Sequence, residues 1–100
     1  MKKPVVIVAG APKSGTTSVF KFLAEHPEVC GSRVKEPAFF INDYSSDARK
    51  NLALYSENFS HCGKGDYTYY LEASAGYINH AGVARKIHDF LGENCRLIFI

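Results

Sequence analysis

The fold of this chain is decided by the stretch Val5-Val6-Ile7-Val8-Ala9-Gly10-Ala11-Pro12-Lys13-Ser14-Gly15-Thr16-Thr17-Ser18, which begins apolar and then turns polar. Residues 5–9 are apolar and mostly β-branched, which is typical of a parallel strand covered on both faces. Gly10 breaks this run, and a helix is expected from about Ser14 or Gly15 to His26. A strand, a glycine-containing turn and a helix in this order predict an α/β protein.

The rest of the chain alternates further predicted strands with predicted helices. Strands are expected at 29–30, 66–73 and 97–100. A second helix is expected to start after Ser46. A third is expected to be capped by Asn79 and to end at Gly92. The side chains expected to face inward are Val19, Phe22 and Leu23 in the first helix, Leu52, Tyr55 and Phe59 in the second, and Val83, Ile87, Phe90 and Leu91 in the third. The pattern predicts one parallel sheet flanked by helices, with no domain boundary inside residues 1–100.

The composition is that of a small globular protein. The chain has 100 residues, 46% of them hydrophobic, and a net charge of 12 − 10 = +2. These values argue against a disordered tail and a disulfide-dense miniprotein, and the small charge predicts neither a nucleic-acid partner nor a membrane surface. The apolar run at 5–9 is too short to span a bilayer, and Met1 lies too close to it to leave room for a membrane anchor, so a cytoplasmic enzyme is expected.

The cysteines and histidines predict no metal site. Cys30, Cys62 and Cys95 are odd in number and widely spaced, so all three are expected to be reduced thiols. The histidines are expected at the surface or at helix ends; they are His26, His61, His80 and His88. None of them has a metal-ligand spacing with a cysteine or a carboxylate.

The turn at residues 10–18 has the features of an anion site. The start of a helix leaves backbone N–H groups free, and the positive end of the helix dipole lies there. Gly15 would let the backbone approach a phosphate oxygen, and Lys13 adds a positive charge. Hydroxyl donors come from Ser14, Thr16, Thr17 and Ser18. The simpler alternative is a strand-to-helix turn in which these residues only cap the helix.

The turn departs from the common nucleoside-triphosphate loop G-x-x-x-x-G-K-[ST]. Gly10, Gly15 and Thr17 fit that pattern, but its lysine position holds Thr16, and the lysine stands at Lys13 instead. This departure weighs against an ordinary kinase or ATPase. A P-loop nucleotide kinase or phosphotransferase with an aberrant loop stays open as the alternative function.

Residues 12–17, Pro-Lys-Ser-Gly-Thr-Thr, resemble the 5′-phosphosulfate loop of sulfotransferases that use 3′-phosphoadenosine 5′-phosphosulfate. Residues 26–29 and 35–40 resemble a segment of the carbohydrate and bacterial branches, and residues 72–77 and 96–100 are similar to later blocks of the family. The resemblance implies a P-loop nucleotide-hydrolase-like sulfotransferase fold. Residues 1–100 would be the N-terminal part of a single such domain, about its first third.

The resemblance also implies a reaction and its site residues. The co-substrate would be 3′-phosphoadenosine 5′-phosphosulfate, with no metal, and its product 3′,5′-adenosine bisphosphate. The residues implied to bind it are Lys13, Ser14, Gly15, Thr16, Thr17 and Ser18. Lys13 would also stabilise the leaving oxygen, and Glu36 would act as general base toward a small-molecule or carbohydrate hydroxyl acceptor. The family's 3′-phosphate ligands, an arginine and a serine, would lie beyond Ile100, so an inactive fragment is a further alternative.

Some of these assignments have plain structural alternatives. The structural alternative for Glu36 is a solvated loop charge paired with Lys35 or Arg33. Many carbohydrate-modifying relatives carry a lysine where this chain has Ala73, and this departure weakens the resemblance to that branch. The aromatic residues that could line an acceptor pocket, but are more often core, are Phe39, Phe40 and Tyr77.

Overall fold

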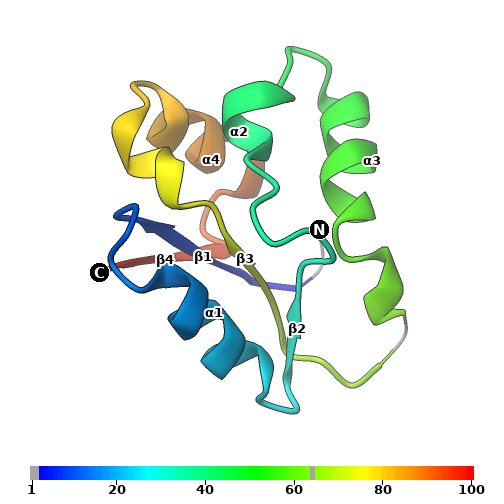
Figure 1. Ribbon diagram of the computed structural model, residues 1–100. Coiled ribbons are helices and arrows are strands. Elements are labelled where there is room, and N and C mark those ends of the chain that lie inside the picture. The colour runs from blue at the N-terminus through cyan, green and yellow to red at the C-terminus, as the bar shows by residue number, and fades with distance from the viewer. Residues whose placement is uncertain (1–2, 64) are drawn as a thin grey trace.

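The computed structural model describes residues 3–63 and 65–100, and a four-stranded parallel sheet forms its centre (Figure 1). The strands, in the spatial order β2-β3-β1-β4, are β1 (Val5–Gly10), β2 (Val29–Gly31), β3 (Tyr69–Ala73) and β4 (Cys95–Phe99). Val8 of β1 pairs with Ala73 on one side and Ile98 on the other, so three strands end at the same edge of the sheet. The predicted parallel α/β sheet flanked by helices is confirmed.

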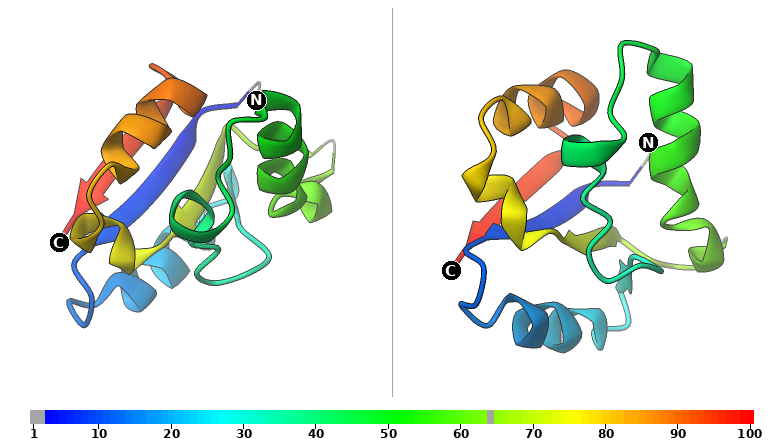
Figure 2. Two further views of the ribbon diagram at one scale, coloured as in Figure 1. Left: turned by 90° about the horizontal axis from the view of Figure 1, so that it is seen from above. Right: turned by 45° about the horizontal axis from the view of Figure 1, so that its top comes forward.

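Helices cover both faces of this sheet, as the two views of Figure 2 show. One face carries α1 (Thr16–Ala24), and the other carries α2 (Phe39–Asn42), α3 (Ala48–Glu57) and α4 (Val83–Leu91). Two short 3₁₀ turns, η1 (Ser60–Cys62) and η2 (Ala75–Asn79), follow α3 and β3. The predicted alternation of strands and helices is therefore present.

The period of two along β1 divides the core between the two faces. Val8 packs under α1 with Leu71, whereas Val5 and Ile7 face the three helices on the other side. That second face holds the larger core, whose buried aromatic residues are Phe39, Phe40, Tyr55, Phe59 and Tyr77. The interpretation of Phe39 and Phe40 as core residues is thereby supported, since both are at most 2% exposed.

Two of the predicted inward-facing residues are in fact exposed. Phe22 is 75% exposed because α1 contacts the sheet through positions three and four apart, Thr16, Val19, Phe20 and Leu23. Leu52 is 45% exposed, and its neighbour Asn51 points inward instead. The Asn51 amide exchanges hydrogen bonds with the backbone of Ser45, which fixes that face of α3. The prediction is wrong at both positions because neighbouring residues with specific contacts decide the rotation of each helix.

The boundaries of the later elements also differ from expectation. Asn79 does not cap the third predicted helix, because it ends η2 and Gly82 is the N-cap residue of α4. Gly92 ends α4 as predicted, with φ at 58°. The strand expected over 66–73 begins only at Tyr69.

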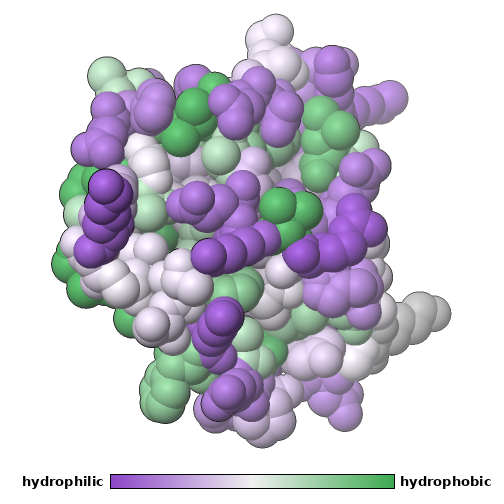
Figure 3. All heavy atoms as spheres, viewed as in Figure 1, coloured by the Kyte–Doolittle hydropathy of each residue, from purple (hydrophilic) through white to green (hydrophobic). Residues whose placement is uncertain are grey.

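β4 lies at one edge of the sheet, and its apolar side chains are not buried as expected. Leu97 is 42% exposed and Phe99 is 57% exposed, because β4 is an edge strand and both side chains line an open groove together with residues of η2 and α4. On the face drawn in Figure 3, apolar side chains lie in small groups among hydrophilic ones. No helix within residues 3–63 and 65–100 combines the length and apolar character that a membrane span requires.

Candidate functional site

The loop between β1 and α1 depends on two glycines for different reasons. A Cβ on Gly10 would lie 2.7 Å from the Ile78 side chain, so the start of the loop packs against η2. Gly15, the N-cap residue of α1, has a φ of 83°, and a Cβ there would meet nothing within 4 Å. Gly10 therefore allows close packing, whereas Gly15 leaves open space at the helix N-terminus.

The helix N-terminus next to Gly15 has no side-chain cap among residues 3–63 and 65–100. The first N–H groups of a helix have no intrahelical acceptor, and no side chain caps this one. The structure therefore does not support the alternative in which the hydroxyl groups serve only as caps. Open donors at the positive end of a helix dipole favour an anion as the missing partner.

The predicted binding residues all lie in this loop or the first turn of α1, but they are not equally accessible. Lys13 and Ser18 are exposed, and the Ser14 hydroxyl donates to the Pro12 carbonyl at 3.4 Å. Thr17 is half-buried and Thr16 is only 9% exposed. Among the described residues, Lys13 has no ion-pair or hydrogen-bond partner, so its charge is available to a ligand.

Glu36 lies on an irregular segment between β2 and α2, and its carboxylate has a defined partner. The Ala75 backbone N–H donates to Glu36 Oε1 at 2.9 Å. Ala75 is the first residue of η2, immediately beyond the carboxyl end of β3. Within the described residues Glu36 forms no ion pair with Lys35 or Arg33, so the explanation of Glu36 as a paired surface charge is not supported.

The loop and Glu36 lie at the same edge of the sheet. The Ala75 carbonyl is 3.4 Å from the position of a Cβ on Gly10, while the Ala75 N–H binds Glu36. One residue of η2 thus contacts the start of the loop and the carboxylate. In parallel sheets, ligands bind outside the carboxyl ends of the strands, and this edge has that position.

A buried acid beneath this edge was missed by sequence reasoning. Glu72 of β3 is completely buried and accepts hydrogen bonds from the Tyr55 hydroxyl at Oε2 and the Ser74 hydroxyl at Oε1, the latter at 2.8 Å. Burial raises the pKa of Glu72, while the two hydroxyl donors oppose that rise. A signal was available, because a glutamate in the interior of a predicted buried strand needs a partner.

The buried acid is connected to the segment that carries Glu36. Ser74 donates to Glu72 and accepts from the Ala38 backbone N–H at 3.0 Å. Ala38 lies two residues after Glu36, and Ser74 lies directly before Ala75. Glu72 and Ser74 therefore hold both sides of the contact between Glu36 and Ala75. Tyr77, the remaining aromatic candidate, is 3% exposed and lines a groove of about 210 Å³ at this end of the sheet.

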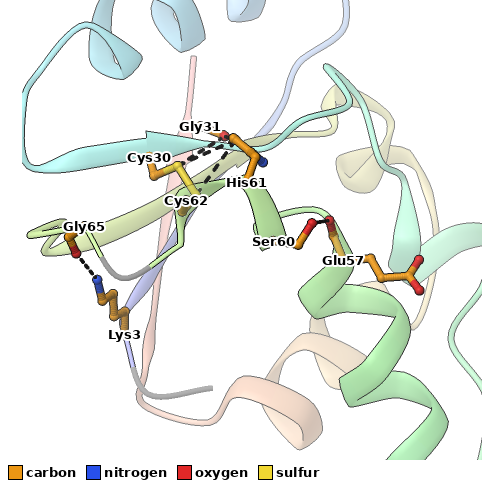
Figure 4. Close-up of a disulfide and its surroundings, with 8 residues drawn as sticks. All are labelled: Lys3, Cys30, Gly31, Glu57, Ser60, His61, Cys62 and Gly65. Carbon is orange, nitrogen blue, oxygen red and sulfur yellow. Dashed lines mark hydrogen bonds between the residues drawn. A yellow bond between two sulfur atoms is a disulfide. The ribbon is translucent and has the colours of Figure 1, made fainter.

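The cysteines correct another prediction. Cys30 and Cys62 form a disulfide across 32 residues of chain, so the expectation of three free thiols is wrong for this pair. Cys95 is a free thiol whose pKa is raised to about 11, mainly by burial. The four histidines are exposed as predicted, but the fold brings His61 against the disulfide (Figure 4).

Comparison with known proteins connects the fold to one class of enzyme. No protein family model and no curated protein sequence matches the chain. A solved structure that it resembles is the crystal structure of a sulfotransferase from Alicyclobacillus acidocaldarius, with 26% sequence identity and a TM-score of 0.77. The match covers 99% of this chain and 44% of the other, so this chain spans less than half the length of that sulfotransferase. The parallel sheet and its helices therefore form an α/β fold of the sulfotransferase kind.

Proposed function

We propose that the protein is a sulfotransferase that moves a sulfuryl group from 3′-phosphoadenosine 5′-phosphosulfate to a hydroxyl group. The observation that carries this proposal is the open helix N-terminus at Gly15, with the unpaired Lys13 beside it, in a fold of the sulfotransferase kind. Because the chain spans 44% of the solved sulfotransferase, the activity is proposed for the whole protein.

The residues of the loop suit the 5′-phosphosulfate end of this donor. A Cβ at position 15 would project into open space, so glycine lets phosphate oxygens approach the N–H groups of the first turn. Thr16 is largely buried, so it would contribute its backbone N–H, whereas Ser14, Thr17 and Ser18 would also offer hydroxyl groups. The geometry thus fits an oxyanion held mainly by backbone donors.

Lys13 would supply the charge that the transfer requires. Sulfuryl transfer is related to phosphoryl transfer, in which positioning and neutralisation of developing charge dominate catalysis. An exposed ammonium group that has no partner within the described part of the chain is free to stabilise the leaving phosphate oxygen. No metal is needed for this role in the proposal.

Glu36 would be the general base that accepts the proton of the acceptor hydroxyl. Its Oε1 accepts the Ala75 N–H, which fixes the carboxylate at the strand edge and leaves Oε2 available for a substrate proton. The acceptor is proposed to be a small-molecule or carbohydrate alcohol. The location is proposed to be the cytoplasm.

Binding of the donor product tests the proposal against a nucleotide kinase. The full-length protein is titrated with 3′,5′-adenosine bisphosphate and, separately, with ATP and magnesium. We expect metal-independent binding of the bisphosphate that weakens at least tenfold in Lys13→Ala. Magnesium-dependent binding of ATP without binding of the bisphosphate would instead identify the kinase alternative, and binding of neither would overturn both enzymatic assignments.

A further inference from the structure

A second group of reactive side chains lies at the edge strand β2, away from the proposed active site. It consists of Cys30, His61 and Cys62, which we call the Cys-His-Cys cluster (Figure 4). His61 Nε2 lies 3.6 Å from Cys30 Sγ and 3.8 Å from Cys62 Sγ. The two cysteines are each 6% exposed and His61 is exposed, so the cluster is shielded on one side and open to solvent on the other.

We propose that this cluster binds a zinc-like divalent cation when the disulfide is reduced. Zinc is held at about 2.3 Å by thiolate sulfur and about 2.0–2.1 Å by imidazole nitrogen, in tetrahedral geometry. Those bond lengths and angles place a nitrogen and a sulfur ligand about 3.6 Å apart, and two sulfur ligands about 3.8 Å apart. The two observed nitrogen-to-sulfur distances already match those values, so metal binding requires that the sulfur atoms separate and that His61 release its present hydrogen bond.

Reduction supplies that separation. A dithiol transfers two electrons and two protons to the Cys30–Cys62 disulfide and itself becomes a disulfide. The metal then binds both sulfurs as thiolates and displaces their two protons into solvent. In the oxidised protein the bond between Cys30 and Cys62 takes the place of the metal. The disulfide form and the metal-bound form therefore exclude each other.

His61 must change its hydrogen bond for the metal to bind. In the disulfide form its Nε2–H donates to the Gly31 carbonyl at 2.9 Å. A metal ligand needs the lone pair of that nitrogen, so the ring takes the Nδ1–H form and the bond to Gly31 is lost. Water completes the tetrahedron on the exposed side of the cluster.

The position of the cluster separates the metal from the proposed transfer reaction. Cys30 pairs with Tyr70, and Val5 at the start of β1 pairs with the same residue. The cluster therefore lies toward the amino end of the sheet, opposite the loop at Gly15. Within the described residues β2 pairs with β3 alone, and the disulfide joins this edge strand covalently to η1, beside the hydrogen bond from His61 to Gly31.

Cobalt(II) and zinc titrations of the full-length protein test the proposal. After reduction with a dithiol and removal of the reductant, we expect one equivalent of cobalt to give tetrahedral ligand-field bands and thiolate charge-transfer absorption that depend on Cys30 and Cys62. Zinc should displace the cobalt and raise the melting temperature of the reduced protein. His61→Ala, a change at an exposed side chain, should weaken binding by at least about tenfold, since even changes behind a metal ligand cost that much. Cys95→Ser is the matched control and should bind like the wild type.

The disulfide form provides the opposing measurement. The oxidised protein should give none of these bands at the same cobalt concentration. Equal binding by oxidised and reduced protein, or binding that survives both His61→Ala and Cys30→Ser, would overturn the proposal. Because Cys30→Ser could unfold the protein, circular dichroism of each variant accompanies the titration. If Cys30→Ser proves to be unfolded, the proposal is judged from the titration of His61→Ala.

Discussion

The loop at residues 10–18 and the acid network beneath it use polar groups in opposite ways. The loop exposes Lys13 and leaves the donors at the start of α1 without partners, whereas Glu72 is completely buried with a donor on each carboxylate oxygen. Buried polar groups stabilise a fold only when they are paired, and unpaired groups at the surface are free to bind a ligand. Changes in the loop should therefore affect activity, and changes in the network should affect stability first.

The largest effect is expected from Lys13→Ala. Loss of a group that stabilises a developing negative charge typically costs about 3 kcal/mol of transition-state stabilisation, a rate decrease of roughly 100-fold or more. Its exposed side chain has no partner among the described residues, so the melting temperature should hardly change. Steady-state kinetics and thermal unfolding measure the two quantities.

Lys21→Ala is the matched control for that variant, because Lys21 is an exposed lysine in the last turn of α1, the helix that follows the loop. It should change neither quantity. Equal losses of rate in the two variants would show that Lys13 acts only through the general surface charge.

Glu36→Gln should lower kcat by about 100-fold while leaving the affinity for the donor product unchanged. The amide oxygen still accepts the Ala75 N–H, so the segment stays in place while the base is lost. Pre-steady-state and steady-state rates, with calorimetry of product binding, separate the two effects. Full activity of this variant would show that Glu36 is not the general base and only accepts the hydrogen bond from Ala75.

Glu72→Ala should destabilise the protein by about 2 kcal/mol, because the Tyr55 and Ser74 hydroxyls lose their acceptor inside the core. Denaturant unfolding gives this value, and Glu57→Ala, at an exposed glutamate, is the control that should stay within about 0.5 kcal/mol of the wild type. The proposed holding role predicts a fall in kcat with little change in product affinity. An unchanged unfolding free energy would contradict the network as a stabilising element.

A smaller loss of stability than that of Glu72→Ala is expected from Gly15→Ala. A non-glycine residue in the left-handed region costs about 1–2 kcal/mol, and Gly82 offers a matched position with the same φ of 83° and equally open surroundings. Gly15→Ala and Gly82→Ala should therefore be destabilised alike, while only Gly15→Ala loses affinity for 3′,5′-adenosine bisphosphate. Loss of affinity in both would mean that the backbone strain, and not the site, causes it.

Sequence reasoning worked best where the relevant contacts are local. The strand at 5–9, the turn after it and the end of α4 at Gly92 were predicted because each depends on neighbouring residues. It failed at Phe22 and Leu52, since the face that a short helix buries depends on what the sheet presents. It also failed for Cys30 and Cys62, which are brought together only by the pairing of β2 and the path of η1.

The sequence by itself determined the parallel α/β class and the open helix start at Gly15, because an apolar β-branched run followed by glycine and hydroxyl residues has few stable conformations. Only the tertiary structure decided the contact of Glu36 with Ala75, the burial of Glu72 against Tyr55, and the Cys-His-Cys cluster. Each of these joins residues from separate elements. Such pairs are brought together when the core excludes water, and no local pattern encodes the distance between them.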